Sequence, residues 1–245
     1  MFTEVPQDKI KIKAPRMICD DVICDKIPEP LDKKNFVYLI VGSKGQGKTS
    51  LATSILTSRS KPFKAYRGKF DDVIINMPEG SARSIAGDPY KSIPRSNFIA
   101  NFDEKLLETI YERAEEHSQE GENVLALIDD ASAKLKSNKR IIDGLTQLVH
   151  RHRHLRLSLL LLVQSLRSAP LGIRTNLDAV FLFRPTNEKS NEVFREEFLG
   201  GFSRDEADKF MDFVFRKKGD FLMVKLNVQP FEYYRNFNKI NITRK

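Results

Sequence analysis

Residues 42–49 (Gly-Ser-Lys-Gly-Gln-Gly-Lys-Thr) place a lysine and a hydroxyl directly after a glycine-rich turn. They match the pattern G-x-x-x-x-G-K-[S/T], whose backbone N–H groups surround the phosphates of a nucleoside triphosphate. In this pattern Lys48 supplies charge to the β- and γ-phosphates, and the hydroxyl of Thr49 ligates Mg²⁺. The residues expected to bind the nucleotide are Gly42, Ser43, Lys44, Gly45, Gln46, Gly47, Lys48, Thr49 and Ser50.

Two adjacent carboxylates, Asp129 and Asp130, follow the apolar run 124–128. An acid at the end of a buried strand can orient the Mg²⁺ shell beside a phosphate loop, and the next acid can hold and polarise the attacking water. Acids are also common in turns that follow strands. The phosphate loop favours the catalytic interpretation, with Asp129 at the metal and Asp130 at the water.

Gln164 ends another apolar run, 157–163. A neutral amide at that point can contact the γ-phosphate or the attacking water and so sense the state of the nucleotide. The alternative is a polar side chain that is satisfied locally. Its place at the end of a strand favours the sensor, because ligands of parallel sheets bind at the carboxyl ends of the strands.

These residues need elements that bring them together. Strands are predicted at the apolar runs 36–41, 73–77, 124–128, 157–163 and 179–183, and a late strand pair at 221–226 and 231–234. Helices are predicted at 50–56, after a cap at Asn101, at 139–150 and at 203–215, where Ser203 and Glu206 form a capping box. The alternation predicts an α/β fold, a mostly parallel central sheet flanked by helices.

The chain has 245 residues, which suits one such domain with appendages. Residues 1–34 are charged and rich in proline, and we expect an N-terminal arm that packs on the domain or on a neighbour; residues 35–245 form the ATPase domain with its C-terminal strand pair. Cys19 and Cys24 have neither a redox spacing nor a complete zinc site. Without a signal peptide or a membrane span in the sequence, a soluble, intracellular protein is expected.

The distance between Lys48 and Asp129 helps to choose the class of nucleotidase. It admits an extra strand, residues 73–77, between the two motif strands, which is typical of RecA-like ATPases with an additional strand and a catalytic acid. A GTPase would carry Asn-Lys-x-Asp, which residues 186–189 do not match. A nucleoside kinase would need a lid and an acceptor site, and neither has a clear signature.

Taken in order, these motifs resemble the FtsK–HerA superfamily of DNA-translocating ATPases, and most of all the genome-packaging ATPases of poxvirus-type large DNA viruses and virophages. The resemblance covers about residues 36–240. It rests on residues 42–49, on Leu127-Ile128-Asp129-Asp130, on Arg153-His154 before the strand that ends at Gln164, on 172–176 (Gly-Ile-Arg-Thr-Asn) and on 233–237 (Tyr-Tyr-Arg-Asn-Phe). Many members have Asp-Glu where this chain has Asp129-Asp130.

The resemblance implies an ATP- and Mg²⁺-driven pump that moves double-stranded DNA into a preformed capsid. It also implies a homo-oligomeric ring, a pentamer or hexamer, at a capsid or portal vertex, in the host cytoplasm at the assembly site or in the virion. A non-packaging translocase and a nucleotide-gated scaffold stay open as alternatives. In a ring, an arginine of one subunit can stabilise charge at its neighbour's γ-phosphate; Arg153 is the first candidate and Arg174 the second. Each could equally form a surface ion pair or contact a phosphate backbone.

The charge pattern favours a polyanionic partner. Lysine and arginine outnumber aspartate and glutamate by 41 to 33, a net charge of +8. A basic loop after the Asp-Asp turn could touch DNA phosphates in a ring's pore; its residues are Lys134, Lys136, Lys139 and Arg140. His150, His152 and His154 would share one side of a strand entry, where exposure at a subunit or DNA surface is favoured over metal binding.

Overall fold

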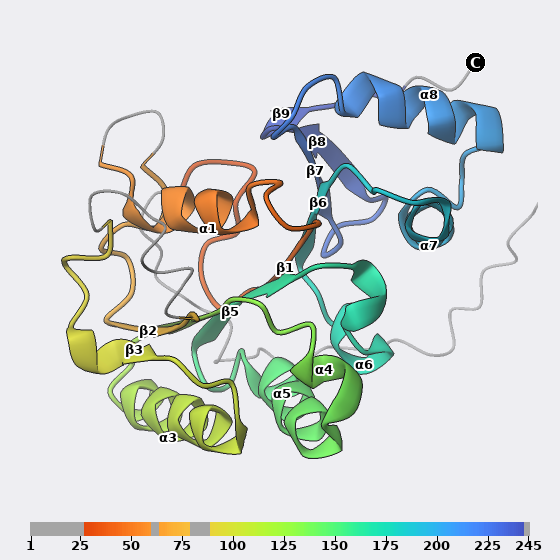
Figure 1. Cartoon of the computed structure of the whole chain (residues 1–245). Helices are drawn as coiled ribbons and strands as arrows, with labels where there is room; N and C mark the ends of the chain where they lie inside the picture. The colour runs from red at the N-terminus through yellow and green to blue at the C-terminus, as the bar shows by residue number, and fades with distance from the viewer. Residues whose placement is uncertain (1–26, 60–63, 79–88, 243–245) are drawn as a thin grey trace, which may run out of the picture.

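The strands form one nine-stranded sheet in the order β3-β2-β4-β5-β1-β6-β7-β8-β9 (Figure 1). The computed structural model describes residues 27–59, 64–78 and 89–242. The parallel strands are β3 (Phe98–Ile99), β2 (Asp72–Asn76), β4 (Val124–Ile128), β5 (Leu157–Val163), β1 (Val37–Val41) and β6 (Ala179–Phe183). The antiparallel strands are β7 (Phe221–Lys225), β8 (Glu232–Arg235) and β9 (Asn238–Lys239). The predicted α/β sheet and its late strand pair are therefore confirmed.

The order of the central strands in the sheet differs from their order along the chain. Residues 73–77 were expected as an extra strand between the two motif strands, and they do lie between them along the chain. In the sheet, β5 separates β1 from β4, and β2 pairs with the outer side of β4. The reason is that a helical crossover lets a parallel strand return to any position in the sheet. The consequence is that β5 ends between the phosphate loop and the two carboxylates.

Helices cover both faces of the sheet (Figure 1). They are α1 (Lys48–Thr57), α3 (Glu104–Gln119), α4 (Lys134–Ser137), α5 (Lys139–Arg151), α6 (Leu171–Arg174), α7 (Glu188–Phe198) and α8 (Arg204–Val214). Apolar residues of α1 pack into the core on one face, and those of α3 to α8 pack into the core on the other.

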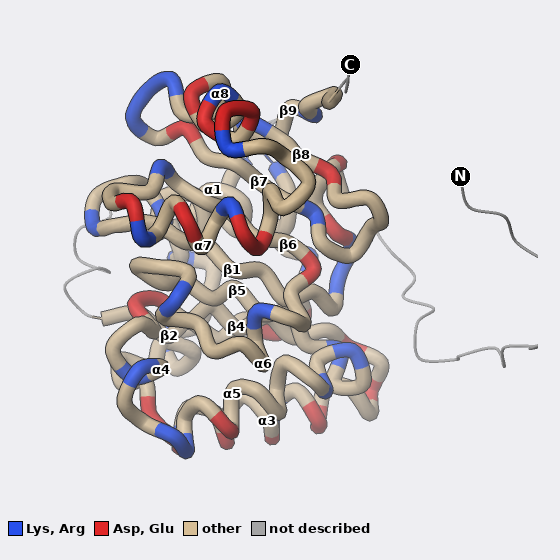
Figure 2. Tube along the Cα trace, turned by 90° about the vertical axis from the view of Figure 1, so that its right-hand side faces the viewer, with Lys and Arg blue, Asp and Glu red and all other residues tan. Residues whose placement is uncertain are grey.

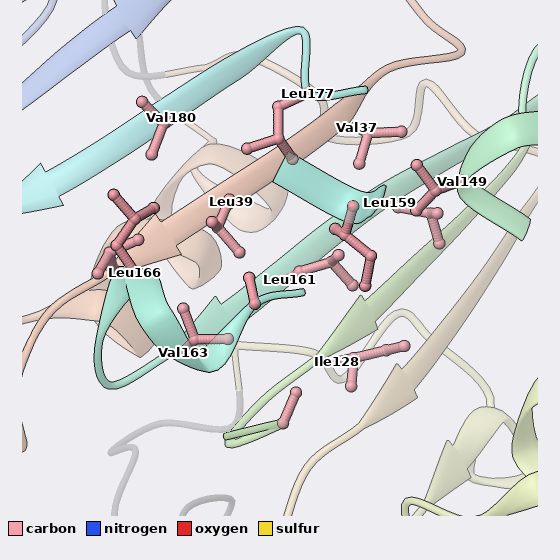
Figure 3. Packing of buried hydrophobic residues seen from close by; sticks show 14 of the residues in the cluster. Val37, Leu39, Ile128, Val149, Leu159, Leu161, Val163, Leu166, Leu177 and Val180 are labelled. Atoms are coloured by element: carbon pink, nitrogen blue, oxygen red, sulfur yellow. The ribbon is translucent and has the colours of Figure 1, made fainter. Parts of the chain in front are cut away.

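Alternate residues of each buried strand serve the two cores. In β1, Val37, Leu39 and Val41 point to one core, and Tyr38 and Ile40 point to the other. Figure 3 shows the first of these cores, where β1 and β5 side chains interlock. Strands that are buried on both faces must be apolar throughout, which explains the continuous runs seen in the sequence.

The ends of the helices confirm some predicted caps and correct others. The capping box between Ser203 and Glu206 starts α8 as expected. Helix α3 begins two residues later than predicted, because the side chain of Asp103, and not that of Asn101, accepts from the Leu106 N–H at 3.0 Å. The expected basic loop after Asp130 is helical, since Asn138 caps α5 through the Ile141 N–H at 3.2 Å.

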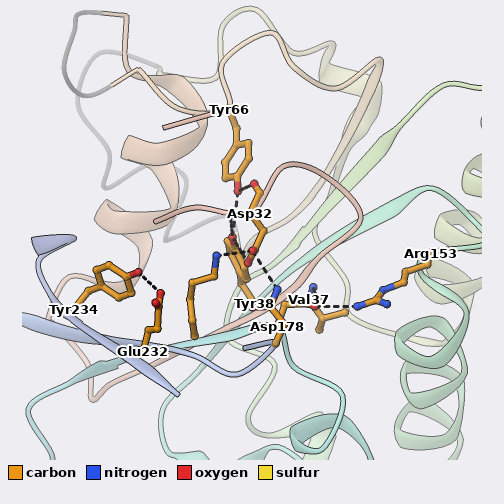
Figure 4. A network of polar contacts seen from close by, with 10 residues as sticks. Asp32, Val37, Tyr38, Tyr66, Arg153, Asp178, Glu232 and Tyr234 are labelled. Atoms are coloured by element: carbon orange, nitrogen blue, oxygen red, sulfur yellow. Dashed lines mark hydrogen bonds and ion pairs between the residues drawn. The ribbon is translucent and has the colours of Figure 1, made fainter. Parts of the chain in front are cut away.

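Residues 27–34 of the expected arm lie against the domain. Leu31 is buried in the core that α1 covers. Asp32 holds this segment on the domain through three contacts (Figure 4). Its Oδ2 accepts a hydrogen bond from the Tyr38 hydroxyl at 3.0 Å, and its backbone carbonyl accepts one from the Tyr66 hydroxyl. Its Oδ1 forms an ion pair with Lys225 at 3.0 Å. Cys19, Cys24 and the rest of residues 1–26 lie outside the described residues.

None of the helices among the described residues has the length and apolar character that crossing a bilayer requires.

Candidate nucleotide site

The phosphate loop joins β1 to α1 at the carboxyl edge of the sheet, as predicted. Gly47 precedes the first turn of α1 with φ 113°, and, within the described residues, no side chain caps this helix end. Gly45 also has a positive φ of 77°, a conformation that favours glycine. An uncapped helix N-terminus that follows such a loop presents unpaired N–H groups and a partial positive charge to an anion.

Gln46 braces the loop from within. Its Oε1 accepts from the Ser43 N–H at 2.6 Å, and its Nε2 donates to the Arg184 carbonyl at 2.7 Å. Gly42 completes the brace, because a Cβ there would lie 2.8 Å from the Gln46 Oε1 and 2.9 Å from the Phe183 Cβ. The side chain of Gln46 therefore sets the shape of the loop, a role that the motif alone does not reveal.

Thr49 and Asp129 meet at the first turn of α1. The Thr49 hydroxyl donates to Asp129 Oδ2 at 2.9 Å. Asp129 is 5% exposed, and burial raises its pKa; the Thr49 hydrogen bond, the Asp130 N–H and the charge of Lys48 offset this only in part. A buried carboxylate with a raised pKa is a group that gains from a cation beside it.

The geometry of this pair fits Mg²⁺. Neighbouring ligands of an octahedral Mg²⁺ lie about 2.9 Å apart when each is roughly 2.0–2.1 Å from the metal, and Thr49 Oγ1 and Asp129 Oδ2 are 2.9 Å apart. Among the described residues, no cluster of three or more histidines, cysteines or acids could hold a metal by itself. Two protein oxygens with phosphates and waters are the usual set for Mg²⁺ at a nucleotide.

Asp130 and Gln164 are joined across neighbouring strands. The Gln164 Nε2 donates to Asp130 Oδ1 at 3.0 Å, and the Gln164 N–H donates to the Ser132 hydroxyl at 2.7 Å. Asp130 has a φ of 58°, an uncommon conformation for a residue other than glycine. Strain of this kind concentrates at functional sites, where the surrounding structure fixes a side chain in place.

Lys48 lies between the loop and the two carboxylates. Its Nζ donates to the Ser43 carbonyl at 3.3 Å. Burial lowers its pKa, while the charges of Asp129 and Asp130 act in the opposite direction. The lysine is thus partly desolvated and close to both acids, which suits a cation that phosphate oxygens will neutralise.

The two arginine candidates do not join this cluster within the chain. Arg153 lies before β5, at the end of the strand opposite Gln164, and β5 has 7 residues, a length of roughly 23 Å. Its Nη2 pairs with Asp178 Oδ1 at 3.3 Å (Figure 4). Arg174 is 17% exposed and forms an ion pair with Glu197 of α7. Each guanidinium is therefore held by a carboxylate of its own chain.

The histidines depart from the prediction. Residues 150–154 form the end of α5 and the turn after it, not a strand entry, so the three rings do not share a side. His152 is buried at 7% exposure, with Nδ1 2.6 Å from the Val149 carbonyl and Nε2 3.8 Å from Asp178. Its ring packs inside the domain instead of facing a partner, because the helix end turns it inward.

Tyr90 was not predicted from the sequence. Its hydroxyl lies 2.7 Å from that of Thr53, one turn after Thr49 on α1. Burial first, and the charge of Asp129 as a lesser cause, raise the pKa of Tyr90 to about 12 against the opposing Thr53 hydrogen bond. Only the fold brings this tyrosine to α1, within reach of the charge of Asp129, and no motif marks it.

Comparisons with known proteins were made for the sequence and for the fold. No family model matches the sequence. B204, the DNA-packaging ATPase from Sulfolobus Turreted Icosahedral Virus, superposes with a TM-score of 0.58 at 16% identity, over 82% of this chain and 97% of B204. The cytoplasmic domain of the Thermomonospora curvata Type VII secretion ATPase EccC has a TM-score of 0.52 at 14% identity, over 81% of this chain and 25% of EccC.

The pCW3 conjugation coupling protein TcpA likewise superposes with a TM-score of 0.52 at 14% identity, over 84% of this chain and 60% of TcpA. The fold is therefore that of P-loop ATPases, and the predicted resemblance to packaging ATPases is confirmed in the fold. Uncharacterized protein 075L of Invertebrate iridescent virus 6 is 30% identical over 192 residues, 75% of this chain and 67% of the relative. The chain belongs to the family of this viral protein.

Proposed function

We propose that this chain is an ATP-hydrolysing motor that moves double-stranded DNA into a preformed viral capsid. The observation that carries the proposal is the pair of contacts across three strand ends, Thr49–Asp129 and Gln164–Asp130. Together they support the proposal of a metal position, a base for water and an amide sensor around one phosphate loop. A chain that only bound nucleotide would not need the last two.

The chain's own residues divide the chemistry. Backbone N–H groups of the loop and Lys48 hold the β- and γ-phosphates, and Thr49 and Asp129 would hold Mg²⁺, which would neutralise charge on the phosphates. Asp130 takes a proton from the attacking water. Gln164, hydrogen-bonded to Asp130 at 3.0 Å, orients that water and responds to the loss of the γ-phosphate.

Coupling to DNA is assigned to the segment that follows the carboxylates. Helices α4 and α5 begin within ten residues of Asp130, and their Lys134, Lys136 and Lys139 side chains are exposed. Arg140 is 82% exposed and lies 3.6 Å from Glu104. Contacts between such residues and DNA phosphates carry no sequence information, which suits a motor that must move any sequence.

Packaging is favoured over conjugation or secretion because a viral protein is the family relative and a viral packaging ATPase shares the fold. In the proposed ring, Arg153 or Arg174 reaches the neighbour's γ-phosphate, and the ring docks on a capsid or portal vertex. The arginines' ion pairs with Asp178 and Glu197 would open on assembly.

The test is ATP hydrolysis with and without duplex DNA, over a series of salt concentrations. Duplex DNA should raise the rate, and salt should remove that stimulation, because phosphate contacts release counterions. Lys48→Ala should abolish hydrolysis. If the wild-type rate is no greater than that of Asp130→Asn, the chain is a nucleotide-gated scaffold; if DNA never stimulates an assembled ring, it is not a DNA motor.

A further inference from the structure

A cavity lies on the side of the phosphate loop away from Asp129. It has a volume of about 290 Å³ and is bounded by Gln46 of the loop, by Phe183 and Arg184 at the end of β6, and by the turn 215–220 between α8 and β7. This turn carries Arg216, Lys217 and Lys218 in succession, and Figure 2 shows the basic stretch beside α8.

The turn is built around one buried carboxylate. Asp220 is 2% exposed, and its Oδ2 accepts from the Arg216 N–H at 3.1 Å and from the Lys217 N–H at 3.0 Å. Arg235 donates to the same oxygen at 2.9 Å, and Asn236 donates to Oδ1 at 2.7 Å. Burial alone raises the pKa of Asp220, but these hydrogen bonds outweigh burial and hold the pKa well below its usual range.

The direction of a bound nucleotide follows from the order of the strands. Thr49 of α1 and Asp129 at the end of β4 would hold the Mg²⁺ that accompanies the β- and γ-phosphates. Gln164, the γ-phosphate sensor, ends β5. The γ-phosphate therefore lies toward β4 and β5, and the nucleoside end of the triphosphate points the other way across β1, toward β6 and β7. The cavity beside turn 215–220 is on that side.

We propose that this cavity holds the ribose and base of the nucleotide, that Lys217 and Lys218 donate hydrogen bonds to the nucleoside, and that the site discriminates only weakly between bases. The inference rests on the proposed function, because it assumes a triphosphate on the loop.

Weak discrimination follows from the polar groups that line the cavity. Adenine presents an amine donor where guanine presents a carbonyl acceptor, so a selective site needs an acceptor for the amine. Gln46 is already bonded at both ends of its amide, and both Asp220 oxygens accept internal donors. Arg216 is fixed on Phe213, with Nε 3.2 Å from its carbonyl and the guanidinium 4.7 Å from its ring centre.

Lys217 and Lys218 are exposed and, within the described residues, have no ion-pair partner. They are donors only. A cavity lined by such groups can hold sugar hydroxyls and base acceptors without distinguishing the four bases.

The test compares Mg²⁺ complexes of ATP, GTP, CTP and UTP with inorganic tripolyphosphate, which lacks a nucleoside. Equilibrium binding and steady-state hydrolysis are measured for the wild type, for the double variant Lys217→Ala/Lys218→Ala and for Lys209→Ala. Lys209 lies on the exposed face of α8 and pairs with Asp205, so its variant controls for a lost surface charge.

We expect ATP and GTP to bind within about tenfold of each other, since no base-specific hydrogen bond separates them. The double variant should weaken the binding of every nucleoside triphosphate by about tenfold or more and leave the binding of tripolyphosphate unchanged. The inference is wrong if the wild type prefers ATP to GTP by a hundredfold or more. It is also wrong if the double variant loses as much affinity for tripolyphosphate as for the nucleoside triphosphates. If the wild-type protein does not bind tripolyphosphate, residues 42–49 are not a phosphate site, and the proposed function is wrong as well.

Discussion

Gln164 and Asp130 are hydrogen-bonded at 3.0 Å although 34 residues separate them in the chain. The contact exists because β4 and β5 are parallel neighbours that end at the same edge of the sheet. It links the group expected to activate water with the group expected to sense the γ-phosphate. A change in one is therefore transmitted directly to the other.

Gln164→Ala should lower kcat by about 100-fold and leave ATP binding nearly unchanged, because the amide orients the water and not the whole nucleotide. Steady-state hydrolysis and equilibrium nucleotide binding check this. Gln147→Ala, an exposed glutamine of α5, is the matched control and should behave as wild type. A loss of binding equal to the loss of rate would show that Gln164 holds the nucleotide.

Mg²⁺ dependence should change with pH through Asp129. Its pKa is raised by burial, so it takes up a proton at a higher pH than an ordinary carboxyl group. Mg²⁺ affinity should be full well above that pKa and should fall as the pH drops toward it. The Mg²⁺ concentration for half-maximal hydrolysis, measured from pH 7.5 down to pH 5, should rise severalfold.

Asp129→Asn serves as the reference for this titration. It should hydrolyse ATP very slowly, and its residual Mg²⁺ affinity should respond to pH less than that of the wild type, through the terminal phosphate of ATP alone. If the Mg²⁺ requirements of the wild type and of Asp129→Asn changed with pH in the same way, Asp129 would not be the metal ligand.

Gly42→Ala should destabilise the domain by about 1–3 kcal/mol, the usual cost of overpacking. The added methyl group would lie 2.8 Å from Gln46 Oε1 and 2.9 Å from the Phe183 Cβ, closer than van der Waals contact allows. Chemical unfolding measures the free energy. Gly200→Ala is the control, because its nearest contact would be an ordinary 3.5 Å; similar losses for both would contradict the packing explanation.

Subunit mixing tests whether Arg153 acts on a neighbouring site. Arg153→Ala keeps its own phosphate loop intact, and Lys48→Ala keeps its arginine intact. Each variant alone should be inactive, and a mixture of the two should regain part of the hydrolysis rate if the arginine acts in trans. Arg174→Ala in place of Arg153→Ala identifies which arginine is responsible.

The stability of Arg153→Ala separates this role from a structural one. The Arg153 side chain is 56% exposed, whereas Asp178 is 8% exposed. Asp178 keeps its hydrogen bond from the Val37 N–H at 2.8 Å when the guanidinium is removed, and the loss of the solvent-exposed partner costs about 1 kcal/mol. The free energy of unfolding of Arg153→Ala should therefore be close to that of the wild type. If the variant is inactive and also strongly destabilised, its inactivity is a folding defect.

Local patterns in the sequence predicted the phosphate loop and the five buried parallel strands β1, β2, β4, β5 and β6 to within one residue at each end. A buried parallel strand must be apolar along its length, and a loop that curls around phosphates must contain glycine, so both are visible within a few residues. The capping box of Ser203 and Glu206 is visible for the same reason, since its donors and acceptors are three residues apart.

The tertiary structure decided which of these pieces meet. Four features depend on contacts between segments that are distant in the sequence. They are the place of β5 between β1 and β4, the hydrogen bond from Gln46 to the Arg184 carbonyl, the position of Tyr90 and the burial of His152. Helical crossovers allow several strand orders for one sequence of elements, so spacing alone does not choose among them. The strand order of this sheet buries both of its faces and brings Asp130 into contact with Gln164.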